Sequence, residues 1–127
     1  MLMKLRAMAL LFISPKGRIG RLPYWLAAAM VTAIFLLTLP ILEPLLGRWG
    51  TIAAYLPFYW PAYCLMAKRS HDIGRSAAWL FVVLIPVAGP LWLFAVLGFR
   101  RGNPGVNQYG PDPRRMPPDY LVVEAVA

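Results

Sequence analysis

The adjacent residues His71 and Asp72 are the pair in this sequence whose types best fit acid–base chemistry. A histidine beside a carboxylate can exchange protons near neutral pH, and His-Asp doublets also bind metals in some phosphohydrolases. Such metal centres need further histidines, whereas His71 is the single histidine of the chain and Cys64 the single cysteine. We therefore expect no metal site, no cofactor, no intramolecular disulfide and no complete catalytic group.

Basic residues on both sides of this pair favour the binding of an anion over catalysis. Ser76 is a candidate N-cap for a following helix, whose first-turn amide groups attract negative charge. A phosphate, an anionic lipid headgroup or an acidic segment of a partner protein would each fit such a site. The alternative is structural, with Asp72 paired to Arg69, Arg75 or Arg21 and the arginines serving topology alone. The candidate site residues are Arg18, Arg21, Lys68, Arg69, His71, Asp72, Arg75 and Ser76.

Three long intervals without charged residues must position these groups, at residues 22–42, 49–67 and 76–99. At about 1.5 Å per helical residue they extend roughly 29 to 36 Å, enough for a hydrocarbon core of about 30 Å. With 60% hydrophobic residues and a mean hydropathy of +0.59, the chain is too apolar for an ordinary soluble domain. We predict an all-α membrane protein with three hydrophobic helices and a short interfacial helix at residues 1–13.

The net charge of +8 is distributed as in a membrane protein and not as on a nucleic-acid-binding surface. Five basic residues precede the first interval and three lie between residues 68 and 75, against one in the loop at residues 43–48. Because basic loops stay on the cytoplasmic side, this asymmetry predicts a multi-pass protein with a cytoplasmic N-terminus. It also argues against nucleic acid as a partner.

The third interval allows two topologies, because Pro86 and Pro90 interrupt it. A continuous helix kinked at these prolines would cross the membrane and place the C-terminal side outside. A re-entrant hairpin folded at residues 86–90 would return that side to the cytoplasm, in better agreement with the positive-inside rule. We prefer the continuous helix, because each limb of a hairpin would hold only about ten residues and would need neighbouring helices to cover its turn.

Three motifs flank these intervals: GRIGRLPYW at residues 17–25, KRSHDIGRSAAW at 68–79 and GNPGVNQYGPDP at 102–113. In order and position they resemble the small bacterial inner-membrane family known as domain of unknown function 805 (DUF805), also called YhaH-like. Residues that match its pattern are Gly17, Arg18, Arg21, Tyr24 and Trp25, then Arg69, His71, Asp72, Ser76 and Trp79, then Asn107, Tyr109, Gly110, Pro111, Asp112 and Pro113. One departure is Ala78, where a second tryptophan is usual.

The resemblance implies a multi-pass bacterial inner-membrane protein and brings no established reaction. We expect one membrane domain at residues 1–113 and a flexible tail at 114–127. The last motif, at residues 107–113, has the composition of a fixed turn, because proline restricts the chain and glycine permits a positive φ. If the third interval is a hairpin, this turn should pack over the loop of His71 and Asp72, and Asp112 should meet Arg18, Arg21 or Arg69.

For the function we favour a non-enzymatic membrane module that binds anionic phospholipid, a membrane protein partner or a second copy of the chain. A transporter or channel component is the alternative, although such proteins normally carry ionisable residues within their spans, and all three intervals lack them. The third class is an enzyme acting on a lipid phosphate, with His71 as its acid or base.

Overall fold

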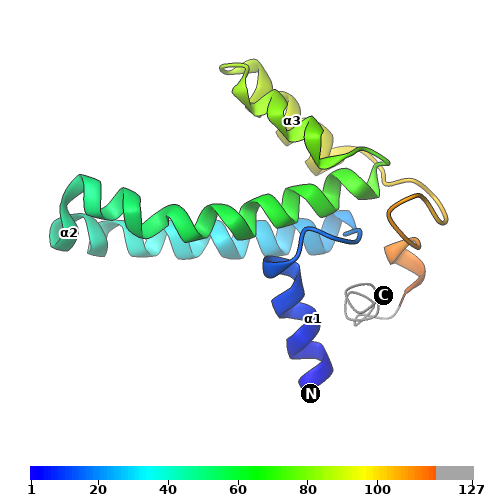
Figure 1. Cartoon of the computed structure of the whole chain (residues 1–127), viewed down its shortest axis with the longest axis horizontal. Helices are drawn as coiled ribbons and strands as arrows, with labels where there is room; N and C mark the ends of the chain where they lie inside the picture. Colours follow the sequence, from blue (N-terminus) through cyan, green and yellow to red (C-terminus); the bar gives the residue numbers. More distant parts are fainter. Residues whose placement is uncertain (117–127) are drawn as a thin grey trace.

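The computed structural model of the chain describes residues 1–116, and the expected 114–127 tail lies largely outside them. The described part is helical, as predicted, and its elements follow the chain in a simple order (Figure 1). They are α1 (Leu2–Ile13), α2 (Arg21–Asp72), the 3₁₀ helix η1 (Ala77–Leu84), α3 (Ala88–Phe99) and the short 3₁₀ helix η2 (Pro113–Arg115).

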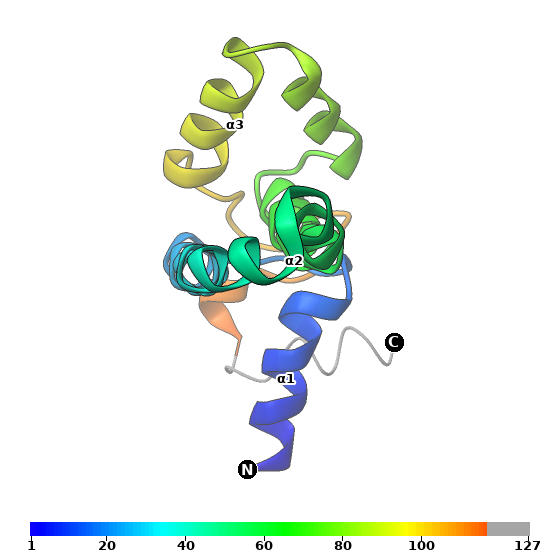
Figure 2. The same cartoon turned by 90° about the vertical axis from the view of Figure 1, so that its left-hand side faces the viewer.

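Helix α2 is a hairpin of two arms that run side by side in opposite directions (Figures 1 and 2). Gly47 turns the chain with φ 67° and ψ 173°, a backbone conformation that is essentially restricted to glycine. Its 52 residues thus form two arms of roughly 25 residues, each about 37 Å long and able to cross a bilayer. The rings of Phe35 and Tyr55 lie 4.4 Å apart between the arms, and the Thr38 hydroxyl lies 2.9 Å from that of Tyr55.

These arms contain the first two predicted spans, and the helix continues beyond both of them. The expected loop at residues 43–48 is helical except at Gly47. The most apolar 18-residue window of α2 has a mean hydropathy of 2.2 and is only 6% buried within the protein. A core helix of a soluble protein would be covered, so this exposure fits a helix whose surroundings are lipid.

The third apolar interval folds back on itself, and the preferred continuous helix is therefore wrong (Figure 2). Pro86 cannot donate a helical hydrogen bond and keeps Ile85 extended, at ψ 111°, and Val87 then reverses the chain with φ 62°. At Gly89 a Cβ atom would lie 1.9 Å from the Val82 carbonyl oxygen, so the two limbs meet at their tip. We call η1 and α3 together the fold-back.

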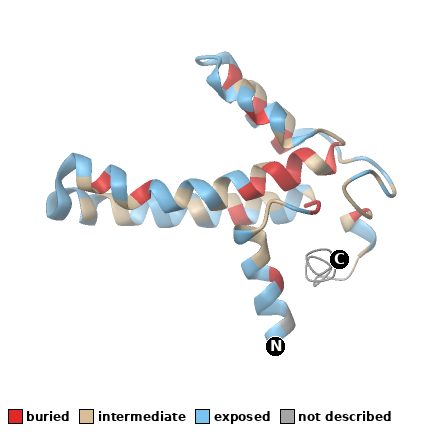
Figure 3. Cartoon of the chain, viewed as in Figure 1, coloured by how far each residue is buried: buried red, intermediate tan, exposed pale blue. Residues whose placement is uncertain are grey.

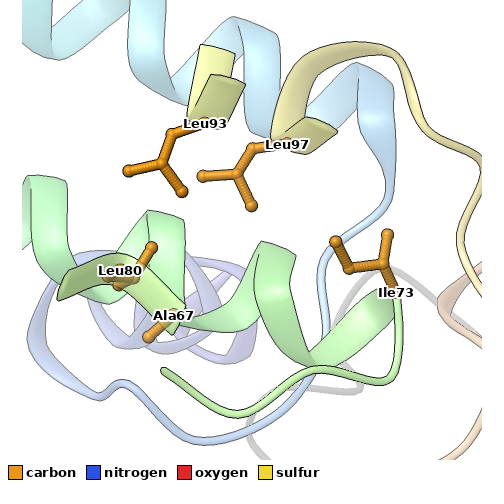
Figure 4. Packing of buried hydrophobic residues seen from close by; sticks show 5 residues of the cluster. All are labelled: Ala67, Ile73, Leu80, Leu93 and Leu97. Carbon is orange, nitrogen blue, oxygen red and sulfur yellow. The ribbon is translucent and has the colours of Figure 1, made fainter. Parts of the chain in front are cut away.

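Buried residues concentrate at the end of the hairpin where α2 begins and ends, which we call the basic end (Figure 3). There the fold-back packs against the second arm of α2 through a small apolar core (Figure 4). Its buried members are Ala67, Ile73, Leu80, Leu93 and Leu97. Both ends of the third interval therefore lie at the basic end.

The predicted short helix near the N-terminus is present as α1, which extends crosswise from the hairpin (Figure 1). Its C-terminal end is fastened to the second arm of α2 by two side chains. The Lys68 ammonium donates hydrogen bonds to the carbonyls of Leu10, Leu11 and Ser14, and the Trp60 indole donates to Ile13 at 2.8 Å. A cation at this position satisfies the last carbonyls of the helix and its negative dipole end.

Candidate functional site

A buried ion-pair network on Asp72, the last residue of α2, forms the centre of the basic end. Arg18 donates to Asp72 Oδ1 from Nε at 3.2 Å and from Nη2 at 3.0 Å, and Arg69 donates to Oδ2 from Nη1. Neither guanidinium is exposed to solvent. Since one carboxylate faces two cations, the excess positive charge must be stabilised by other acceptors.

Backbone carbonyls supply those acceptors to Arg69. Its Nε donates to the Leu97 carbonyl at 2.7 Å, and its Nη2 donates to the Arg100 carbonyl. A longer contact of 3.4 Å joins Nη1 to the Ile19 carbonyl. Arg69 therefore holds the end of α3 and the segment before α2 against the end of the hairpin.

Arg18 does the same for the segment that follows α3. It donates to the carbonyl oxygens of Asn103 at 2.7 Å, Gly105 at 2.7 Å and Gly110 at 3.1 Å. At Gly102, a Cβ atom would lie 2.0 Å from Asp72 Oδ2, so the chain passes too close to the carboxylate for any other residue. The first, second and third motifs thus meet on one carboxylate.

His71 lies beside this network and contacts other protein groups. Its Nδ1 is 3.1 Å from the Gly17 carbonyl oxygen, and its ring stacks on Tyr109 with centroids 4.0 Å apart and 9° between the planes. The Asn107 amide also donates to the His71 carbonyl at 2.9 Å. The expected packing of the 107–113 turn over the His71 and Asp72 loop is confirmed.

The expected ion pair of Asp112 with Arg18, Arg21 or Arg69 is wrong. Arg114 lies two residues away and reaches the carboxylate first, donating from Nε at 3.0 Å and from Nη2 at 2.9 Å. Backbone amides of Arg114 and Gly105 add two more hydrogen bonds, so the motif closes on itself as a fixed turn. These donors hold the pKa of the Asp112 carboxyl well below its usual range.

The remaining candidates divide between covered and accessible positions. The Arg75 guanidinium lies over the rings of Trp79 and Trp92, 4.5 and 5.0 Å from their centroids, and Ser76 caps η1 by accepting from the Ala78 amide at 3.0 Å. Ser76 is therefore the expected N-cap, although of a 3₁₀ helix. Of the predicted arginines, Arg21 alone is exposed.

The candidate set thus contains an internal framework, made by Arg18, Lys68, Arg69 and Asp72, and one accessible cation. Four accessible arginines of the same end were not among the predicted residues. They are Arg100, Arg101, Arg114 and Arg115. The sequence shows them as two adjacent pairs after the third interval. They lie at the same end as Arg21 because the third interval folds back.

Comparison with known proteins gives a consistent result over most of the chain. Residues 12–111 match the family model described as "Protein of unknown function (DUF805)". The chain is 36% identical over 115 residues to "Inner membrane protein YhaH" of Escherichia coli strain K12, which covers 84% of this chain and 92% of the relative. It is 31% identical over 122 residues to "Uncharacterized protein YiiR" of the same strain, covering 76% and 84%. No solved structure matches the chain.

Proposed function

Because the chain belongs to the DUF805 family, we propose that it is a non-enzymatic inner-membrane module whose basic end faces the cytoplasm and binds anionic phospholipid headgroups. The observation that carries this proposal is the separation of charge at the basic end. Both carboxylates described there, Asp72 and Asp112, are buried and paired with arginines. The accessible charges described at this end are the cations Lys16, Arg21, Arg100, Arg101, Arg114 and Arg115.

The orientation follows from the same distribution. Of the 13 lysine and arginine residues, Arg48 alone lies beside the Gly47 turn at the opposite end of the hairpin. Cytoplasmic segments of membrane proteins carry such an excess of basic residues, and the cytoplasmic leaflet carries the anionic lipids that attract them. A basic residue close to that surface contributes about 1 kcal/mol of attraction.

The contacts of His71 and Asp72 favour a binding module over an enzyme. In a catalytic His-Asp pair the carboxylate accepts a hydrogen bond from the imidazole, whereas Nδ1 of His71 lies against the Gly17 carbonyl and the ring stacks on Tyr109. Asp72 is likewise taken up by Arg18 and Arg69. The pair that best fitted acid–base chemistry thus supports the fold of the basic end.

Lipid analysis of the purified protein tests this proposal. We expect phosphatidylglycerol and cardiolipin to be enriched over phosphatidylethanolamine, relative to the membrane from which the protein was extracted. Replacing Arg100, Arg101 and Arg115 by glutamine should reduce this enrichment about fivefold for each charge removed, or about a hundredfold in all. Arg48→Gln is the matched control at the opposite end and should leave it unchanged. A lipid composition equal to that of the membrane would refute the proposal.

A further inference from the structure

A groove of about 520 Å³ lies at the basic end, between the start of α2 and the end of α3. Its walls come from three segments that are far apart in the sequence. The lining residues are Gly20, Arg21, Leu22, Pro23, Trp25, Gly98, Phe99 and Arg114. The lining of the groove therefore combines two cations with apolar and aromatic side chains.

The two arginines of the groove differ in their contacts with the protein, and both have N–H groups available to a ligand. Arg114 is fixed in position by Asp112, which takes up its Nε and Nη2, while no described residue accepts a hydrogen bond from its Nη1. Arg21 is exposed and forms no ion pair within the described part of the chain. One guanidinium is therefore preorganised, and the other is accessible to a ligand.

The apolar lining of the groove includes the rings of Trp25 and Phe99, which we call the aromatic wall. Trp25 packs closely against the end of α3. The Trp25 indole donates to the Gly98 carbonyl at 3.1 Å, and a Cβ atom at Gly98 would lie 2.6 Å from the Trp25 ring. Phe94 and Phe99 contact the same indole, with centroid distances of 5.4 and 5.8 Å. Tryptophan and its apolar neighbours are typical of the boundary between headgroups and acyl chains.

We propose that this groove is a specific site for one anionic phospholipid, which rests on the proposed function and locates its binding site. The lipid phosphate lies between Arg21 and Arg114, and the glycerol backbone and the first acyl carbons lie along Trp25 and Phe99. Guanidinium groups bind phosphate oxygens through charge-assisted hydrogen bonds, and the aromatic wall contacts the part of the lipid that a free phosphate lacks. A patch of cations alone would attract any anion, whereas this groove offers arginines to the lipid phosphate and aromatic rings to the acyl chains.

Native mass spectrometry of the delipidated full-length protein in detergent tests the site, with phosphatidylglycerol and phosphatidylcholine as probes. We expect one phosphatidylglycerol to bind more tightly than the rest, and phosphatidylcholine to show no such event. Arg21→Gln should weaken that first event roughly tenfold, and Arg21→Gln with Arg114→Gln roughly a hundredfold. The double variant Arg100→Gln with Arg101→Gln is the matched control, because it removes the same charge outside the groove. It should weaken the first and the later phosphatidylglycerol events alike and leave the ratio between them unchanged, whereas the groove variants should weaken the first event selectively.

Each other result overturns a defined part of the inference. If the groove variants, like the control variant, weaken the first and the later events alike, the site is refuted while the proposed function stays intact. Absence of any preference of the unaltered protein for phosphatidylglycerol would refute the proposed function itself. Displacement of the lipid by an equal concentration of glycerol 3-phosphate would assign the groove to soluble phosphates and refute the lipid. Arg21→Gln alone suffices for these comparisons if Arg114→Gln disturbs the Asp112 turn.

Discussion

Replacing Asp72 by asparagine tests whether the buried ion-pair network holds the basic end together. The substitution keeps the shape of the side chain, but it removes the negative charge that faces Arg18 and Arg69, both of which are buried. It also puts an amide donor where one of the two arginines now finds an acceptor. We expect the substituted chain to insert into the membrane, because the apolar arms of α2 are unchanged.

The size of the effect follows from the partners that remain. Removing one member of a buried ion pair typically costs about 3–5 kcal/mol, because the other member is left buried without its counter-charge. Here the two guanidinium groups keep their hydrogen bonds to the carbonyls of Asn103, Gly105 and Leu97. We therefore expect the lower end of that range, about 3 kcal/mol, which is about 150-fold in the ratio of folded to unfolded protein.

Cys64 provides the assay, because it is the single cysteine of the chain and is fully buried. A thiol-reactive fluorophore added during denaturant titration in detergent reports the fraction of molecules in which Cys64 has become accessible. Glu43→Gln, at the Gly47 end, removes an exposed carboxylate and serves as the control with an unchanged midpoint. If Asp72→Asn unfolds at the same midpoint as the control, the network does not stabilise this end and the reasoning fails.

Three further predictions concern the segment after α3. Gly102→Ala should lower the Cys64 unfolding midpoint, because its methyl group would lie 2.0 Å from Asp72 Oδ2, and an unchanged midpoint would show that this loop lies elsewhere. The folded pKa of Asp112 is depressed, so its contribution to stability is present above its unfolded pKa of about 3.9 and is lost as the pH falls below that value. Thermal unfolding followed by tryptophan fluorescence from pH 6 to pH 3 should therefore depend less on pH in Asp112→Asn than in the unaltered protein, and equal dependence would contradict this. A reporter that functions only in the cytoplasm should be active when it is fused to the C-terminus, whereas activity of a reporter that functions only outside would contradict the proposed cytoplasmic basic end.

The long spans were predictable from the sequence because lipid imposes a simple requirement. A helix that crosses a bilayer must be apolar over about 20 residues, so intervals without charge locate it. The turn between the arms was less visible, since a single glycine at position 47 reverses the chain and the helical pattern continues on both sides. Pairing of Asp72 with Arg69 was one of the structural alternatives, because three residues separate neighbours on one helix face.

The fold-back and the internal role of Lys68 were not predictable in the same way. The choice between a crossing helix and a hairpin depended on two opposing observations, the short limbs and the excess of basic residues after Phe99. The fold-back is covered by the second arm of α2, and this tertiary contact is not visible in any local sequence pattern. Lys68 caps α1, whose end lies more than 50 residues earlier in the chain, and this too depends on the packing of the two helices.

The length of the fold-back makes the molecule unequal across the thickness of a bilayer. At about 2.0 and 1.5 Å per residue, η1 and α3 extend roughly 16 and 18 Å from the basic end, about half the hydrocarbon thickness. A molecule seated along its hairpin therefore occupies the leaflet at the Gly47 end with two helices, and the leaflet at the basic end with two helices and the fold-back. It displaces more lipid from the leaflet at the basic end than from the other one, so several copies gathered in one patch would bend the membrane, with the face at the basic end convex.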